Sequence, residues 1–385
     1  MQQADVLCQG WCDLPFHLLD GVRDALRFCG ELTRFLKASR LVNRHWSAWG
    51  TESVPFLNLS GDVPLGTLAG VVATKFKRVR GLGFRKHRGF AEADLCQLTQ
   101  LRGLTHVDLG FCRITNEGLA HVGLLSSLTS LNLRWNKRFT GEGLAHVARL
   151  TGLRNLDLDS CQQITDSALE HVASLTALTC LNLSGYSITA AGFAHVGKLT
   201  SLIRLDLSKC GVLTDEGIAH VGKLTSLRHL NCCCGEVTGA GFAAASAGLA
   251  GIASLRLSDC SDENLYHVGR LTNLVDLCAC GWGITDEGLT HVGRLVNLTQ
   301  LELSDIDFVT DEGLVHLTGL TALRRLDLSG CWGTADAWRP LKRLPSRVRL
   351  RLPLCDSCSW EADLEGEGEE GWDWGLREMF GDGDC

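Results

Sequence analysis

A short pattern of apolar residues recurs at fixed spacing along most of this chain. The pattern L-x-x-L-x-L returns in steps of 24 or 25 residues, with one step of 22. Its first positions are Val54, Val79, Leu104, Leu128, Leu153, Leu178, Leu202, Leu227, Ile252, Leu274, Leu298 and Leu323, and a weaker copy begins at Arg347. Because alternate residues are apolar, each copy predicts a short strand whose apolar side chains face inward.

Each leucine pattern is preceded by a segment with helical spacing of its apolar residues. The stretch TDEGIAHVGKLTSL, from Thr214, returns nearly unchanged as TNEGLAHVGLLSSL from Thr115 and TDEGLTHVGRLVNL from Thr285. The threonine can cap a helix, acidic residues are favourable in its first turn, and a basic residue near its end complements the helix dipole. The period therefore predicts a solenoid in which every unit has one strand and one helix.

Cysteine recurs eight residues after the first leucine. It stands there in five units, as Cys112, Cys161, Cys210, Cys260 and Cys331. A small thiol at an inward-facing position behaves as a compact hydrophobic side chain. The period and this cysteine position resemble the cysteine-containing leucine-rich repeats, from about Val54 to Leu352. The resemblance implies an α/β fold, a right-handed horseshoe of short parallel strands with helices on the convex side. The cysteine is replaced by Asn136, Tyr186, Trp282 and Ile306.

One histidine per unit stands in the predicted helices. They are His121, His146, His171, His195, His220, His267, His291 and His316. Neighbouring helices pack about 8–10 Å apart, whereas zinc–nitrogen bonds are about 2 Å long. We therefore interpret the row as part of the repeated unit and not as metal or catalytic sites.

The segment before the repeats has a different pattern, which predicts two or three short helices between Leu14 and Trp46. Its Leu-Pro start and its RLVNRHW end resemble an F-box, with Asn43 in place of the usual cysteine. The resemblance implies that an SCF-type ubiquitin-ligase adaptor binds Leu14, Pro15, Leu18, Leu19, Leu41, Val42 and Trp46. The alternative is a helical cap that covers the first apolar face of the solenoid.

Charge separates the repeats from the end of the chain. The net charge is −7, and residues 355–385 contain eleven acidic residues and one basic residue, so the remainder is about +3. The composition of this tail favours disorder. We expect a lead over residues 1–13, the F-box-like segment over 14–50, about 12 repeats over 54–352 and the acidic tail over 355–385.

The sequence carries no signal that we would expect of a secreted or membrane protein. Its start lacks the basic segment and the apolar segment of a secretion signal. No apolar run approaches the roughly 18 residues of a membrane span. The 18 cysteines are then expected to be thiols in a reducing compartment, the cytoplasm or the nucleus.

Motifs typical of catalysis and of metal binding are missing from the sequence. There is no G-x-S-x-G, no P-loop and no G-x-G-x-x-G that opens a strand–helix unit. Cys355 and Cys358 form a lone CxxC, whereas a structural zinc site needs four ligands. We therefore expect no enzyme activity, metal or cofactor.

The concave face of a solenoid is its usual partner surface. Residues two, four and six positions past each first leucine should project there, and departures from the repeat are where specificity can reside. The candidate partner-binding residues are Arg134, Trp135, Asp157, Arg204, His229, Arg256, Trp282 and Arg325. We expect a protein to bind there, and neither a membrane nor a nucleic acid.

An F-box-like segment directly before such repeats resembles the substrate receptors of cullin-based SCF ubiquitin ligases. The resemblance implies a non-catalytic subunit that binds adaptor and cullin and holds a target protein for ubiquitin-dependent degradation. The alternative is an interaction scaffold in a cytoskeletal or ciliary assembly.

Overall fold

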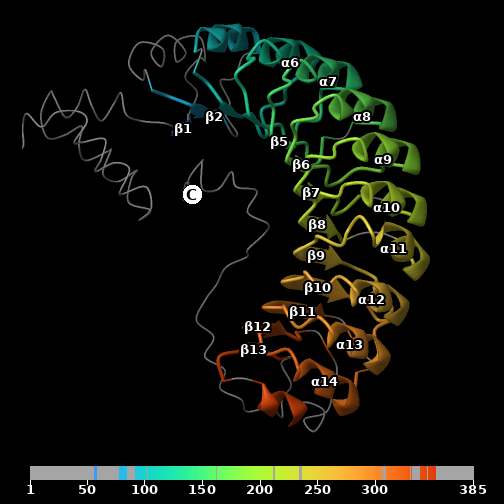
Figure 1. Ribbon diagram of the computed structural model, residues 1–385. Coiled ribbons are helices and arrows are strands. Elements are labelled where there is room, and N and C mark those ends of the chain that lie inside the picture. Colours follow the sequence, from blue (N-terminus) through green and yellow to red (C-terminus); the bar gives the residue numbers. More distant parts are fainter. Residues whose placement is uncertain are drawn as a thin grey trace, which may run out of the picture.

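Strands and helices alternate along one continuous arc in the computed structural model. The structure describes residues 56–58, 78–84, 92–101, 103–161, 163–210, 213–233, 236–304, 306, 309–329, 331, 339–344 and 346–352. The strands line the inner side of the arc and the helices its outer side (Figure 1). The strand-and-helix solenoid predicted from the period is confirmed.

Over the residues that the structure describes, the inner side is one parallel sheet of thirteen strands in chain order. The strands are β1 (Phe56–Asn58), β2 (Gly81–Gly83), β3 (His106–Asp108), β4 (Ser130–Asn132), β5 (Asn155–Asp157), β6 (Cys180–Asn182), β7 (Arg204–Asp206), β8 (His229–Cys232), β9 (Ser254–Leu257), β10 (Asp276–Cys280), β11 (Gln300–Ser304), β12 (Arg325–Asp327) and β13 (Arg349–Arg351). Each strand begins two residues after the first position of its leucine pattern. The pattern therefore predicted all thirteen strands correctly, the weak copy at Arg347 included.

The helices of the outer side follow the same period. They are the 3-10 helices η1 (Glu92–Gln100) and η2 (Arg339–Arg343) and the α-helices α6 (Asn116–Val122), α7 (Gly141–Val147), α8 (Asp166–Ala173), α9 (Ala190–Val196), α10 (Asp215–Val221), α11 (Gly239–Ala245), α12 (Asp262–Val268), α13 (Asp286–Val292) and α14 (Asp311–Leu317). In the described part of the chain, no helix has the length and apolar composition needed to cross a bilayer.

The leucines of the pattern form the core between the sheet and the helices. In the unit of β4, Leu128, Leu131 and Leu133 are fully buried, and Leu144 of the following helix closes the core from the convex side. Leucines at equivalent positions of the neighbouring units are buried in the same way. Hydrophobic burial is therefore spread evenly along the solenoid, and each unit depends on its two neighbours.

The cysteine position is an inward slot that satisfies a backbone carbonyl of the preceding unit. All five predicted cysteines are buried free thiols, which confirms that part of the prediction. Four of the thiols donate at 3.0–3.1 Å to the carbonyl oxygens of Phe84, Leu133, Leu183 and Leu303; the donors are Cys112, Cys161, Cys210 and Cys331. A small or well-directed donor in the slot thus satisfies a carbonyl whose burial without a partner would be costly. Ile306 is buried at the equivalent position without a side-chain donor.

Two of the substituted slots keep the same hydrogen bond with a different side chain. Asn136 donates to the carbonyl oxygen of Leu109 at 2.8 Å and accepts from the backbone N–H of Ile114 at 3.0 Å. The hydroxyl of Tyr186 donates to the carbonyl oxygen of Leu158. Trp282 is different, because its side chain is 72% exposed and does not fill the slot.

A carboxylate clamp joins many consecutive helices. Asp286, the first residue of α13, accepts the backbone N–H of Thr310 at 2.8 Å and its hydroxyl at 2.6 Å. Thr310 is the N-cap residue of the next helix, α14. Corresponding carboxylate pairs are Glu92 with Thr115, Asp166 with Thr189, Asp215 with Thr238 and Asp262 with Thr285, and the amide of Asn116 holds Thr140 in the same way. The acidic residue that we expected to favour the helix dipole therefore also holds the following unit.

Candidate functional site

The row at the fourth position past each first leucine lies on the concave side but is mostly buried. Seven of its side chains accept a hydrogen bond from the backbone N–H two residues later, at 2.7–3.2 Å. They are Asp108, Asn132, Asp157, Asn182, Asp206, Asn231 and Asp327, which are 3–8% exposed, whereas Arg256, Cys278 and Glu302 stand at this position on β9, β10 and β11. The seven groups therefore fix the turns after their strands and present little surface to a partner.

Asp157, one of the candidate partner-binding residues, belongs to this buried row. It is 5% exposed and accepts from the N–H of Asp159 at 3.0 Å. Burial raises the pKa of its carboxyl to about 7, against the lowering effects of that hydrogen bond and of Arg134. Asp157 is thus a structural carboxyl, a role that the sequence pattern could not distinguish from surface exposure.

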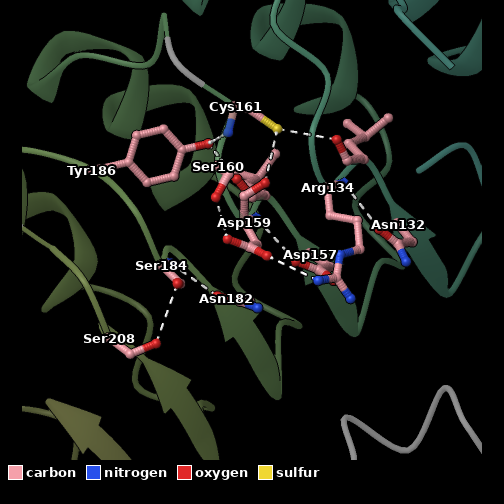
Figure 2. Close-up of polar contacts among 12 residues, drawn as sticks. Asn132, Arg134, Asp157, Asp159, Ser160, Cys161, Asn182, Ser184, Tyr186 and Ser208 are labelled. Carbon is pink, nitrogen blue, oxygen red and sulfur yellow. Dashed lines mark hydrogen bonds and ion pairs between the residues drawn. The ribbon is translucent and has the colours of Figure 1, made fainter. Parts of the chain in front are cut away.

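Arg134 lies at the rim of the same region. Its Nη2 is 3.2 Å from Oδ2 of Asp159, and the Ser160 hydroxyl donates to the other carboxylate oxygen at 2.6 Å (Figure 2). The Arg134 side chain remains about one-third exposed. Its guanidinium is therefore held in place and still reaches solvent, as a partner-binding residue requires.

Arg204 and His229 stand side by side in the middle of the concave face. They are register partners on β7 and β8, and both are half-buried. Burial and the neighbouring Arg204 charge lower the pKa of His229. On the next two strands, the Ser254 hydroxyl donates to Asp276 Oδ2 at 2.7 Å. The centre of the face therefore combines a guanidinium, an imidazole and a carboxyl group.

Arg256 reaches across one strand toward Glu302. Their Nη2 and Oε2 atoms are 3.9 Å apart, and Cys278 of β10 lies between the two residues in the register. Cys278 Sγ is 3.9 Å from Cys280 Sγ, which is 2.9 Å from the Ser304 hydroxyl. The hydrogen bond from Cys278 lowers the pKa of Cys280 to about 6.

This thiol pair was not among the residues singled out from the sequence. Cysteines at the fourth and sixth positions past Leu274 share one face of a strand, and that spacing is the signal that could have identified them.

The last two candidates lie apart from these groups. Trp282 follows β10 and is exposed, whereas Arg325 at the start of β12 contributes to a charge cluster around Asp327. Asp327 Oδ2 is 3.9 Å from Arg325 Nη2 and 3.5 Å from Arg351 Nη1. The structure thus brings the predicted concave residues together in separate groups along the arc, not in one pocket.

The helical histidines form a row on the convex side. Among the described residues, no group of three or more His, Cys, Asp or Glu side chains is placed to hold a metal ion. His291 is buried against Tyr266, with the two rings 5.2 Å apart at 79°, and burial lowers its pKa. This contact is one of packing between consecutive helices.

The predicted adaptor-binding residues, from Leu14 to Trp46, lie outside the residues that the structure describes. The same is true of the acidic tail, residues 355–385, and of its CxxC. Their predicted roles stay predictions.

Comparison with known proteins supports the repeat. Residues 101–121, 125–148 and 198–219 match the family model described as Leucine Rich repeat. Among solved structures, an internalin (inlF) from Listeria monocytogenes str. 4b F2365 is similar, with 21% identity, a TM-score of 0.55, and coverage of 78% of this chain and 87% of that one. The TLR13–ssRNA13 complex matches with 18% identity and a TM-score of 0.49, over 79% of this chain and 55% of that one. No curated protein sequence matches the chain.

The fold is therefore a leucine-rich-repeat solenoid, as the cysteine-containing repeats led us to expect. At this level of identity, the likeness to the internalin shows the fold alone. The stretches that match the repeat model begin at residue 101 and do not include the F-box-like segment.

Proposed function

We propose that this chain is a non-catalytic recognition subunit, which holds a partner protein on the concave side of its leucine-rich repeats. The observation that supports this proposal is the concave sheet itself. Its turns are fixed by the buried Asp and Asn row, while Arg134, Arg204, His229 and Arg256 keep part of their side chains at the surface. A rigid face with irregular polar side chains suits selective binding, because little conformational entropy is lost on association.

We further propose that residues 14–50 connect this recognition unit to an SCF-type ubiquitin ligase. The support is the F-box resemblance of the Leu14–Trp46 segment and its position directly before the repeats. In this function the adaptor and cullin bind the N-terminal segment, the concave face holds the target, and the chemistry of ubiquitin transfer belongs to other subunits.

Replacement of Leu14 and Pro15 by alanine tests the connection to the ligase. Leucines at the centre of an interface contribute on the order of 1–2 kcal/mol each, so the double variant should lose adaptor binding by at least about tenfold. Its melting temperature should stay that of the unsubstituted protein. The measurements are binding to purified adaptor and a thermal melt of the full chain.

Leu124→Ala is the matched control, because Leu124 is 56% exposed on the repeats. It should change neither adaptor binding nor the melt. A lower melting temperature in the Leu14/Pro15 variant would instead identify the segment as a cap of the solenoid. If the unsubstituted protein fails to bind the adaptor, and adaptor and cullin do not co-purify with it from cells, the ligase function is wrong and the interaction scaffold stands.

A further inference from the structure

A surface of aromatic and cationic side chains lies on the turns that follow β3 and β4. We call it the aromatic–cationic surface, and it encloses a hollow of about 380 Å³ lined by Phe111, Arg113, Trp135, Lys137 and Arg138. Arg134, at the rim of the concave face after β4, adjoins it with its guanidinium 5.8 Å from the Phe111 ring centroid. The surface is thus continuous with the region proposed to hold the partner protein.

The repeat itself produces the pair of rings. Phe111 and Trp135 occupy the seventh position past the first leucine in consecutive units, and both have left-handed backbone, with φ of 62° and 58°. Adjacent strands of a sheet lie about 4.8 Å apart, so side chains at equivalent turns can stack. The two rings are stacked, with centroids 5.5 Å apart and planes within 8°. Trp135 is nevertheless 41% exposed, and Ser160, next in the row, has no ring to extend the stack.

Cationic side chains surround the rings, and the ion pairs of the described residues neutralise few of them. The ammonium of Lys137 lies 5.3 Å from the Trp135 ring centroid, and Arg113 and Arg138 are exposed. Among the described residues, Arg134 has Asp159 as an ion-pair partner, whereas none of the ion pairs involves Arg113, Lys137 or Arg138. Like charges that line one hollow repel one another, and an anion bound among them would relieve that repulsion.

We propose that the aromatic–cationic surface binds an anionic peptide segment of the partner protein. One apolar or aromatic side chain of the segment packs on the Phe111–Trp135 pair, and flanking negative groups contact Arg113, Lys137 and Arg138. The negative groups are carboxylates of Asp or Glu, which suit guanidinium donors. This proposal rests on the proposed protein-recognition function and names the chemistry that this part of the surface selects.

A peptide fits these observations better than a single-stranded nucleic acid does. Strands of nucleic acid bind along positively charged grooves in which successive bases stack on successive aromatic side chains. Here the aromatic row ends after two units, and the following turns carry Asp159, Ser160 and Ser184. One hollow beside two rings has room for one anchoring side chain, with charged residues on either side.

The test measures binding of fluorescein-labelled 12-residue peptides to the full-length protein by anisotropy. One peptide has a tryptophan flanked by glutamates, a second has glutamines in their place, and a third has phosphoserines. A 12-nucleotide oligouridine is the fourth probe. We expect the glutamate peptide to bind at least about tenfold more tightly than the glutamine peptide, and the difference to shrink as salt is raised. Binding of the phosphoserine peptide alone would overturn the proposal and assign the surface to a phosphorylated segment.

Charge reversal locates the binding surface. Lys137→Glu with Arg138→Glu should weaken binding of the anionic peptide by at least about tenfold. The matched control is Arg149→Glu with Lys198→Glu, which makes the same charge change at exposed positions after α7 and α9 and should leave binding unchanged. Trp135→Asn removes the ring, and asparagine tolerates the left-handed backbone at this position. The variant should weaken binding of the anionic peptide about fivefold.

Each of the following results would overturn the proposal: equal binding of the glutamate and glutamine peptides, equal loss in both charge-reversal pairs, or tighter binding of oligouridine with loss in the Lys137/Arg138 variant. The last result would assign the surface to nucleic acid. If no anionic peptide binds while adaptor binding persists, the peptide-binding proposal fails and the ligase function stands. If the peptide binds but the adaptor does not, the peptide-binding proposal stands and the ligase function fails.

Discussion

At the scale of single residues, the buried row of the concave face uses both carboxyl and amide side chains to accept the same backbone hydrogen bond. Asp157 and its neighbours Asn132 and Asn182 accept the same backbone hydrogen bond, from the N–H two residues later. A carboxylate in that place must be desolvated, whereas an amide carries no charge to desolvate. The raised pKa of Asp157, about 7, is the consequence of this difference.

Asp157→Asn should therefore stabilise the protein at alkaline pH. Because the folded pKa lies above the unfolded value, the proton that Asp157 binds contributes stability fully below about pH 4, and this contribution is lost as pH rises through about 7. The variant should exceed the unsubstituted protein by about 1–3 kcal/mol at pH 8 and match it at pH 4. Urea unfolding at a series of pH values measures this.

Asp259→Asn is the control for this prediction, since Asp259 is exposed and has left-handed backbone that asparagine tolerates. It should show no such pH dependence. Lower stability of the Asp157 variant at pH 8 would mean that the ionised carboxylate is stabilised by the Arg134 charge more than it is destabilised by burial.

At the scale of elements, the contacts between consecutive helices decide which residues a position accepts. The carboxylate clamps hold N-cap threonines, and glycines allow the closest approaches. A Cβ added to Gly248, in the turn after α11, would lie 1.5 Å from the carbonyl oxygen of Gly222 at the end of α10. The glycine-rich sequence around α11 is therefore a requirement of packing at this point.

Gly248→Ala should destabilise the protein by more than about 2 kcal/mol, because backbone would have to move to admit the methyl group. Gly152→Ala is the matched control in another turn, where the nearest atom to an added Cβ is 3.9 Å away. It should change stability by less than about 1 kcal/mol. Denaturant midpoints of both variants provide the measurement, and equal midpoints would contradict the close approach at Gly248.

At the scale of the whole molecule, stability is a sum of units and of the junctions between them. The junctions differ, because helices α7, α9 and α11 begin with Gly141, Ala190 and Gly239 and have no carboxylate there to clamp the next N-cap. Of these three, α11 is also built almost entirely of Ala and Gly, and the N-cap that follows it is Ser261 of α12. Ser261 is capped within its own helix instead, with Asn264 Oδ1 accepting from its N–H at 2.9 Å. The unit that follows is also the one with the 22-residue step.

Local opening should accordingly be most frequent at the α11–α12 junction. Within the described repeats, amide hydrogen exchange should be fastest over residues 239–265 and slower at the α13–α14 junction, where Asp286 clamps Thr310. Mass-spectrometric exchange on the full chain gives this comparison. Uniform protection along the array would show that the clamps add little to local stability.

Much of this architecture follows from the sequence alone. The leucine period predicted the position of each described strand. Alternate residues of a strand point to the same face, so the apolar residues of the pattern identify the face that packs against the helix of the same unit. The cysteine position was correctly predicted to be inward, since a small thiol recurs there in register with the buried leucines. These features are local and repeat with the chain.

Contacts between units were decided only in three dimensions. Two kinds of contact join residues about 24 positions apart: the clamp from Asp286 to Thr310 with its equivalents, and the stack of Phe111 on Trp135. The burial of Asp157 likewise depends on the neighbouring units. The period predicts that such residues are neighbours, but their orientation depends on the packing of adjacent turns. Whether a polar side chain on the concave face is buried by its neighbours or reaches solvent is therefore a property of the stacked solenoid and not of any single repeat.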